Sequence, residues 1–120
     1  MQLTLMWNKC EGGDWCRLFG LDLDDDYFDI VNGVYIIWRG GLGRTVLRVG
    51  QGFIREQLYE HQWEDDIKEI DKLELYVTWT PMDADKRAGV VRFLTEVLKP
   101  KAVEGDDPAA QPILVNLPWQ

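Results

Sequence analysis

Cysteine and histidine are scarce in this chain, and long apolar runs are missing from it. Two cysteines and one histidine cannot complete a Cys/His zinc set without help from carboxylates. No apolar run approaches the roughly 20 residues that span a bilayer. The first residues also lack the basic-then-apolar pattern of a secretory signal. These gaps predict a soluble, cytoplasmic protein with no membrane partner.

The two cysteines, Cys10 and Cys16, are separated by a short polar segment. We expect them to be partly buried, reduced thiols, which is the usual state of cysteine in a reducing compartment. A metal-binding role and a disulfide are the alternatives, and the disulfide would require an oxidising compartment. The acidic run 22–26 lacks the glycine and the terminal glutamate of an EF-hand loop. We therefore interpret it as a solvated connector and predict no metal ligands.

The length of the chain bounds its organisation. Its 120 residues, 46% of them apolar, are enough for one domain with one core and too few for two. Six tryptophans spread from one end to the other, which suggests that both ends fold onto the core. Within this single domain we expect an irregular acidic segment over 1–32, a core over 33–100 and an extended tail over 101–120.

The formal net charge is −8, which disfavours nucleic acid as a ligand because Lys and Arg supply most of the affinity for phosphates. The charge is unevenly distributed, however. Segments 33–61 and 83–100 each carry more basic than acidic residues. The candidate nucleic-acid-binding residues are Arg39, Arg44, Arg55 and Arg87. A chance distribution of solvated charges is the alternative interpretation.

Three segments have the patterns of strands. Residues 34–38 are apolar on both faces, as expected for a central strand that is covered on both sides. Residues 45–49 follow a glycine-rich loop and form the hairpin partner. Residues 73–79 alternate between apolar and polar side chains, so one face is covered and the other is open or lines a site. We predict a three-stranded, mainly antiparallel sheet with 34–38 in the middle.

Two segments have the patterns of helices. A helix from about residue 53 places Leu58 and His61 on one face, and residues 63–72 add a further turn or two. A longer helix begins with Thr80 or Asp83 as its N-cap and ends at residues 99–100. Its buried stripe consists of Val90, Leu94 and Val97. The order strand, strand, helix, strand, helix predicts an α+β fold.

Short motifs follow one another along these elements. They are Gly33-Val34-Tyr35, Arg48-Val49-Gly50, Gln57 with His61 four residues later, and the run from Phe93 to Pro100, followed at a longer spacing by Asn116. In order and spacing, residues 33–116 resemble the GIY-YIG nuclease domain superfamily. The resemblance implies a small GIY-YIG-like domain with its central sheet flanked by helices.

The resemblance also implies roles for individual residues. Tyr35 corresponds to a catalytic tyrosine and His61 to the histidine of the site, whereas Gln57 and Val91 replace the family's arginine and its metal-binding glutamate. Arg48 stands where the second tyrosine would be and is the candidate cation. We expect Tyr35, Arg48, Gln57 and His61 to converge on one shallow, locally basic cleft with Val91 on its wall. Packing of Tyr35 and a structural hydrogen bond of His61 are the alternatives.

Hydrolysis of a phosphodiester needs a group that activates water, a cation on the phosphate and a metal ion. Because Gln57 and Val91 remove two of these, the leading hypothesis is a catalytically lapsed domain that binds nucleic acid, weakly, or an unidentified protein. The alternative is an active metal-dependent endonuclease with relocated charges, and only this alternative requires Mg²⁺. A third possibility is a folded accessory protein that makes no contact with nucleic acid.

Overall fold

The computed structural model describes residues 2–41 and 43–119, which form an α+β fold around a mixed sheet. The sheet has five strands, in the order β2 (Cys16–Arg17), β5 (Leu75–Pro81), β3 (Asn32–Arg39), β4 (Thr45–Phe53) and β6 (Ala102–Glu104). The helices are α1 (Ile54–Gln62), α2 (Asp65–Lys68) and α3 (Ala84–Leu98). Three short 3-10 turns, η1 (Glu11–Gly13), η2 (Asp26–Ile30) and η3 (Lys72–Glu74), connect the strands.

The central position of β3 is confirmed, because β3 pairs antiparallel with β4 on one side and with β5 on the other. The predicted number of three strands is wrong. β2 extends the sheet beside β5, and β6 extends it in parallel beside β4. Strands of two and three residues are too short to show a period-2 pattern, so the sequence gives no sign of them.

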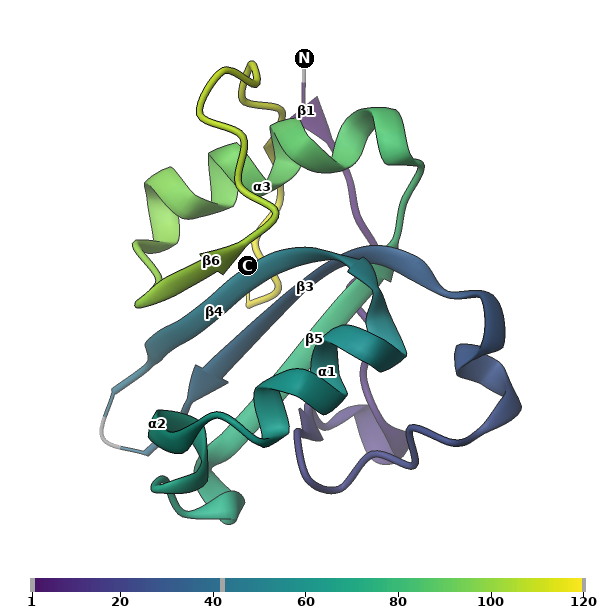
Figure 1. The fold of residues 1–120 in the computed structure, drawn as a ribbon, viewed down its shortest axis with the longest axis vertical. Coiled ribbons are helices and arrows are strands. Elements are labelled where there is room, and N and C mark those ends of the chain that lie inside the picture. The colour runs from purple at the N-terminus through teal and green to yellow at the C-terminus, as the bar shows by residue number, and fades with distance from the viewer. Residues whose placement is uncertain (1, 42, 120) are drawn as a thin grey trace.

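The two long helices cover opposite faces of the sheet (Figure 1). One face, which we call the α1 face, packs Ile54 and Leu58 of α1 against alternate residues of β3 and β5. The other, the α3 face, packs Val90 and Leu94 of α3 against the intervening residues. Alternation along β3 therefore fixes which side chains reach which helix.

A bulge in β4 shifts this alternation. Ile37 lies opposite Arg48 and Trp38 opposite Val46, so Leu47 has no cross-strand partner in β3. Arg48 keeps the register that pairs Gly50 with Tyr35, so it lies opposite Ile37 on the α1 face. The extra residue changes the alternation on the loop side of Arg48, where Leu47 joins the apolar cluster of the α1 face and Val46 joins that of the α3 face.

Several predicted details of the elements are wrong. Val97 is 47% exposed, and the buried stripe of α3 contains Gly89 and Val91 instead. Leu73 lies in η3 and is exposed. Both faces of β5 are covered, because Thr78 on its polar side is fully buried. The period of a helix or strand could not reveal these details, because burial also depends on which other segments of the chain pack against each element.

The two ends of the chain meet on the α3 face. β1 (Gln2–Leu3) pairs in parallel with β7 (Leu114–Val115). Near this pair, the side chain of Asn116 accepts a hydrogen bond from Leu5 N at 2.6 Å and donates one to Leu5 O at 3.1 Å. Residues 101–120, predicted as an extended tail, thus contribute a strand to each of the two sheets.

Cys10 and Cys16 form a disulfide, so the prediction of reduced thiols is wrong. Their Cα atoms lie 5.1 Å apart, within the range that a disulfide spans. Gly12 and Gly13, both with positive φ, turn the chain between them. Disulfides persist mainly in oxidising compartments, so this bond weighs against the predicted cytoplasmic location. Among the described residues, no helix has the length and apolarity needed to cross a membrane.

Candidate functional site

The centre of the candidate site is the hydroxyl of Tyr35, which projects from β3 onto the α1 face. It donates a hydrogen bond to Gln57 Oε1 at 3.0 Å and lies 2.5 Å from His61 Nε2. Gln57 and His61 are one helical turn apart on α1, so both reach the same point on the sheet. Two segments, β3 and α1, therefore meet at one phenol.

Gly50 makes room for this arrangement. It lies opposite Tyr35 in the pairing of β3 with β4. A Cβ at this position would overlap the hydroxyl and ring carbons of Tyr35. The glycine of the Arg48-Val49-Gly50 motif is thus required by the ring of the Gly33-Val34-Tyr35 motif.

The hydrogen bonds continue from His61 to three charged side chains. His61 Nδ1 lies 2.6 Å from Glu64 Oε1, and the same oxygen accepts from Arg48 Nε at 3.0 Å. Arg48 Nη2 donates to Asp66 Oδ1 at 2.8 Å, and Arg48 Nη1 donates to the Leu47 carbonyl at 2.9 Å. All three nitrogens of this guanidinium are therefore engaged within the protein. We call Tyr35, Gln57, His61, Glu64, Arg48 and Asp66 the α1-face network.

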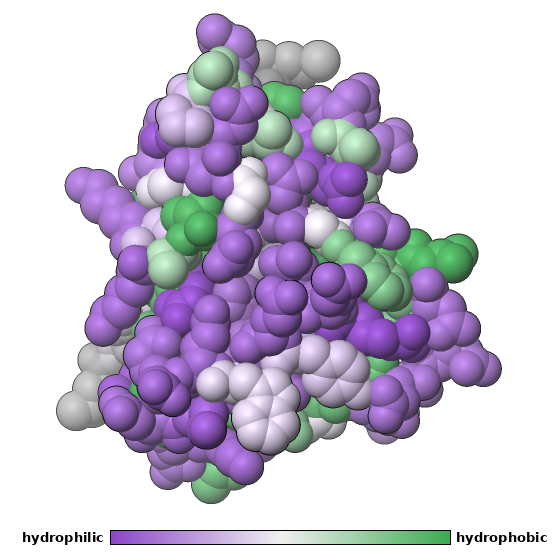
Figure 2. Space-filling model, in the orientation of Figure 1, coloured by the Kyte–Doolittle hydropathy of each residue, from purple (hydrophilic) through white to green (hydrophobic). Residues whose placement is uncertain are grey.

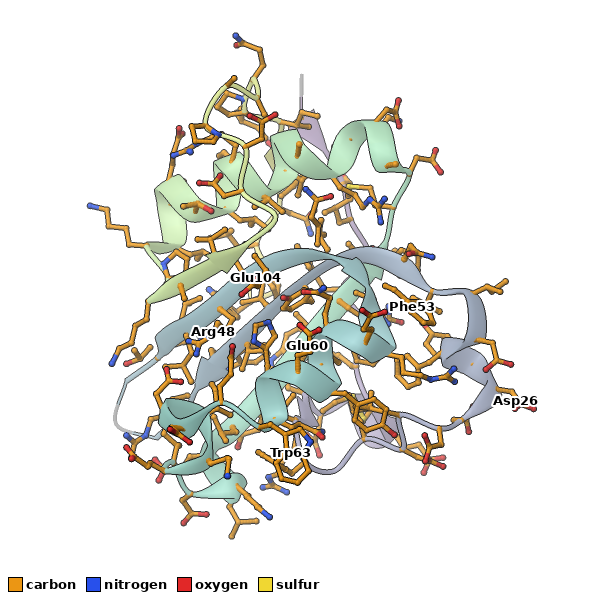
Figure 3. The ribbon with its side chains drawn as sticks, viewed as in Figure 1. Asp26, Arg48, Phe53, Glu60, Trp63 and Glu104 are labelled. Carbon is orange, nitrogen blue, oxygen red and sulfur yellow. A yellow bond between two sulfur atoms is a disulfide. The ribbon has the colours of Figure 1, made fainter. Side chains whose placement is uncertain are left out.

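Ionisation in the network follows from burial and charge. Burial is the largest influence on Tyr35, and together with the negative charges of Glu104 and Glu64 it raises the pKa of the phenol well above its ordinary value of 10.0. Figure 3 shows Arg48 on β4, Glu60 on α1 and Glu104 on β6, whose charges all act on this phenol. The tyrosine is consequently held in its neutral form at neutral pH.

The ion pair between Arg48 and Asp66 shifts the pKa of each of these two residues. Burial acts to lower the pKa of Arg48, but its hydrogen bond to Asp66 and the charge of Glu64 outweigh this and raise it. Burial acts to raise the pKa of Asp66, but the hydrogen bond and charge of Arg48 lower it overall. Arg48 and Asp66 thus stabilise one another's charged forms.

The structure brings together Tyr35, Gln57 and His61 directly, and Arg48 through Glu64. The predicted shallow, basic cleft is wrong. Tyr35 is 0%, His61 1% and Arg48 5% exposed, and two carboxylates neutralise the one guanidinium. The chemical roles assigned to these residues remain predictions.

Val91 and Asn116 lie away from the network. Val91 is fully buried in the apolar cluster of the α3 face, on the other side of the sheet from Tyr35. Its predicted place on the wall of the cleft is therefore wrong, because β3 stands between α3 and the phenol. Asn116 bonds to Leu5 at the meeting point of the two ends of the chain.

Three of the four candidate nucleic-acid-binding arginines are engaged within the protein. Arg39 pairs with Glu74 at 3.4 Å, and the guanidinium carbon of Arg44 lies 3.9 Å from the centre of the Trp119 ring. Arg55, in the first turn of α1, donates to Leu23 O and Asp29 Oδ1. Arg87 lies on α3. These internal contacts leave few of the four charges free for a phosphate backbone.

Sequence reasoning missed Glu64, Asp66 and Glu104. Glu64 follows His61 by three residues, a spacing that allows contact, so this partner could have been found from the sequence. Glu104 could not, because its proximity depends on the pairing of β6 with β4, where Glu104 lies opposite Gly50.

Among the described residues, no group of three His, Cys, Asp or Glu side chains is placed to hold a metal ion. The carboxylates near Tyr35 thus do not fit a divalent cation as they stand. Comparison of the chain with protein-family models and with curated proteins, and of its structure with solved structures, finds no match.

Proposed function

We propose that this chain is a GIY-YIG-like domain whose nuclease chemistry has lapsed and which acts as a binding module. The proposal rests on the motif order of the sequence together with the hydrogen bonds that join Tyr35, Gln57 and His61. These residues come from two of the motifs that carry the resemblance, Gly33-Val34-Tyr35 and Gln57 with His61. The module keeps the tyrosine and the histidine of such a site but lacks the family's arginine and its metal-binding glutamate.

The observation that carries the proposal is the state of Arg48. A guanidinium that neutralises a phosphate must have donors free to turn toward it. Each nitrogen of Arg48 already donates within the protein, to Glu64, Asp66 and Leu47, and the residue is buried among these partners. The only other motif position for a cation holds Gln57, which is neutral. A phosphate at Tyr35 would meet the negative charges of Glu104, Glu64 and Glu60, against the single positive charge of Arg48, which is already paired with two carboxylates.

The tyrosine supports the same conclusion. A general base works best when its pKa is near the working pH, whereas burial and two carboxylates raise the pKa of Tyr35 far from it. The phenol is thereby suited to a structural hydrogen bond rather than to the removal of a proton from water.

The charge distribution favours a protein partner over nucleic acid. The net charge is −8, and the side chains of Arg39, Arg44 and Arg55 are engaged with acids, carbonyls or an aromatic ring. The face shown in Figure 2 is predominantly hydrophilic. Weak binding to DNA at low salt, with a shallow dependence on salt, is expected from the few available phosphate contacts.

A plasmid cleavage assay tests directly whether the nuclease activity has been lost. The purified chain is incubated with supercoiled DNA and with branched DNA in Mg²⁺ or Mn²⁺, beside Tyr35→Phe prepared in the same way. We expect no cleavage by either protein. Nicking by the unmodified chain that disappears in Tyr35→Phe would overturn the proposal, and equal nicking by both would identify a contaminating nuclease.

One observation favours the active-endonuclease alternative. Glu104 lies opposite Gly50, which in turn lies opposite Tyr35, so the three share one row across the sheet. An acid on this row could replace the one lost at Val91. If the unmodified chain nicks DNA, Glu104→Gln should abolish the activity under this alternative and leave it intact otherwise.

A further inference from the structure

A second feature of the molecule lies just beyond the end of α1. Trp63, which follows this helix, is 73% exposed and is the most exposed aromatic side chain among the described residues. Figure 3 shows it at the end of α1, apart from Arg48. Tryptophan side chains are on average largely buried, because they carry a large apolar surface. Most of the Trp63 ring is instead free to stack on another flat group.

Beside Trp63 lies a hollow of about 360 Å³, which we call the Trp63 hollow. Two aromatic rings, two lysines and one amide line it, namely Phe19, Trp63, Lys68, Lys72 and Gln62. Its volume lies within the range of about 300–1,000 Å³ that is typical of small-molecule sites. The hollow therefore has a size that suits a small ligand.

The two lysines of the Trp63 hollow lie over its aromatic rings. Lys68 Nζ is 5.5 Å from the centre of the Trp63 ring, and Lys72 Nζ is 4.8 Å from the centre of the Phe19 ring. The electron-rich face of an aromatic ring attracts a cation at such distances. Among the described residues, neither lysine forms an ion pair with a carboxylate. Both ammonium groups are thus held beside the hollow without an acidic partner.

The acids of this part of the chain are directed elsewhere. Segment 62–72 contains five acidic residues and two lysines, yet no acidic residue lines the hollow. Glu64 and Asp66 bond to Arg48 in the α1-face network. Asp71 accepts a hydrogen bond from a backbone N–H of η3. An acidic segment therefore presents its two cations to the hollow.

The walls of the Trp63 hollow are anchored to the core. Gln62 Nε2, at the end of α1, donates to the carbonyl of Leu18 at 2.9 Å, and Phe19 is the next residue along the chain. Leu18 and Ile67 are both fully buried in the apolar cluster of the α1 face. These contacts fix the segments that carry the two rings and Lys68. The hollow is consequently formed without a ligand.

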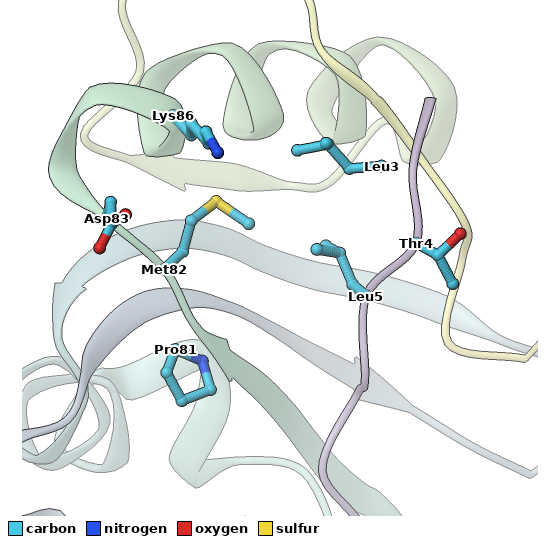
Figure 4. Close-up of a pocket in the computed structure, with 7 residues that line it drawn as sticks. All are labelled: Leu3, Thr4, Leu5, Pro81, Met82, Asp83 and Lys86. Carbon is cyan, nitrogen blue, oxygen red and sulfur yellow. The ribbon is translucent and has the colours of Figure 1, made fainter. Parts of the chain in front are cut away.

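A second hollow provides a contrast. It measures about 370 Å³ and lies between β1 and α3. Figure 4 shows its lining, in which Lys86 and Asp83 lie at one side and Leu3 and Leu5 at the other. Its one cation therefore shares the hollow with an acid, and it has no aromatic ring. Lys86 is exposed, as Lys68 is, and serves as a matched control.

We propose that the Trp63 hollow binds a small aromatic carboxylate. The flat ring of the ligand stacks on Trp63, and its carboxylate lies between the ammonium groups of Lys68 and Lys72. The rings of the hollow select a flat ligand, and its two cations select an anion. This site is separate from the Tyr35 phenol, and the proposal does not depend on the loss of nuclease activity.

The charge of the molecule favours a carboxylate over a phosphate. The chain carries a net charge of −8, and the acidic segment 62–72 surrounds the hollow's two cations in the sequence. A singly charged carboxylate is repelled less by this field than a doubly charged phosphate is. The preferred ligand is therefore a monoanion with one or two fused rings.

The test is a titration of the isotopically labelled full chain, followed by its backbone amide resonances and by the Trp63 indole N–H resonance. The probe is 2-naphthoate. Its neutral twin 2-naphthamide lacks the charge, and cyclohexanecarboxylate lacks the flat ring. We expect 2-naphthoate to shift the resonances of Phe19, Trp63 and Lys68, and each control to bind about tenfold more weakly. No shift at about 10 mM 2-naphthoate, or equal binding of the acid and the amide, would overturn the proposal.

Variants separate the two parts of the site. The double variant Lys68→Met, Lys72→Met keeps the apolar stems and removes both charges, so it should weaken 2-naphthoate binding about tenfold and change 2-naphthamide binding by less than about twofold. Lys86→Met should change neither by more than about twofold. Trp63→Ala should weaken both ligands about fivefold. Spectral dispersion shows that each variant is folded.

Two results would contradict the assignment. The first is binding of 2-naphthoate by the double lysine variant or by Trp63→Ala that equals binding by the unmodified chain. The second is tighter binding of adenosine 5′-monophosphate than of 2-naphthoate, which would show that the hollow prefers a phosphate.

Discussion

The two faces of the sheet are built from the same strands and follow different rules. The α3 face is an apolar cluster in which Val91 and Leu94 meet Val34 and Ile36. The α1 face also has an apolar cluster, but at its edge it buries a phenol, an imidazole and a guanidinium that are joined by hydrogen bonds. Successive side chains along β3 point to opposite faces of the sheet, so neighbouring residues lie in the two different environments.

This difference shows where the chain can carry polar chemistry. On the α3 face the side chains need only volume and apolarity, so the position of Val91 accepts no carboxylate. On the α1 face each buried polar side-chain atom of the network has a partner among the described residues, and the named partners are other side chains of the protein. A network that satisfies itself contributes specificity to the fold but leaves little free for a substrate.

The largest expected effect comes from placing a charge on the α3 face. Val91→Glu buries a carboxylate with no partner in an apolar cluster, and we expect it to lower the free energy of unfolding by about 4 kcal/mol or more. Val97→Glu, on the exposed side of the same helix, should change it by less than about 0.5 kcal/mol. Urea denaturation measures both. Similar stabilities for the two variants would mean that Val91 does not face a closed core.

A smaller effect is expected from crowding the α1 face. Gly50→Ala places a methyl group against the Tyr35 ring, which is fully buried and cannot retreat, at a cost of about 2–3 kcal/mol. Gly43→Ala is the control, because a Cβ there would meet nothing within 4 Å. Thermal unfolding monitored by circular dichroism compares them. A Gly50→Ala variant as stable as Gly43→Ala would show that the ring of Tyr35 can move aside.

Removal of one hydroxyl tests the network itself. Tyr35→Phe leaves His61 and Gln57 without their shared partner, and we expect a loss of about 1–2 kcal/mol. Tyr59→Phe is the matched change at an exposed phenol that bonds to Asp24, and it should destabilise the protein less than Tyr35→Phe does. Chemical denaturation of both variants measures the two losses of stability. Equal losses would argue that burial adds nothing to the hydrogen bonds of Tyr35.

The smallest effect concerns pH. Arg48 lowers the pKa of Asp66 below its ordinary value of 3.8, so this pair stabilises the folded state above that pH. The contribution is lost as the pH falls through the lower folded-state value. Asp66→Asn should therefore be less stable than the unmodified chain near neutral pH, and the difference should vanish in strong acid. Urea midpoints across this range test it, and a difference that is constant with pH would contradict the assigned pair.

Much of the sheet could be predicted from the sequence, because its signals are local. The two-sided apolarity of residues 34–38 indicated a central strand, and β3 is central. The spacing of Gln57 and His61 indicated that they share a face of one helix, and both reach Tyr35. Such features follow from the period of a strand or a helix.

The errors arose where distant segments decide the outcome. The orientation of Val91 depends on which side of the sheet α3 covers, and no motif encodes that. The neutralisation of Arg48 depends on the path of the chain through Glu64 and Asp66, which follow α1. The disulfide depends on two glycines that bring Cys10 back to Cys16.

The central claim is that Tyr35 is locked in a closed network and cannot act as a base. Carbon-13 labelling of tyrosine at Cζ, with Tyr35→Phe to assign the resonance, follows the ionisation of this phenol during a pH titration. The account predicts that the Tyr35 resonance stays at its protonated position past pH 10.0, the ordinary pKa of tyrosine, for as long as the protein remains folded. Ionisation of Tyr35 below that value in the folded protein would contradict it.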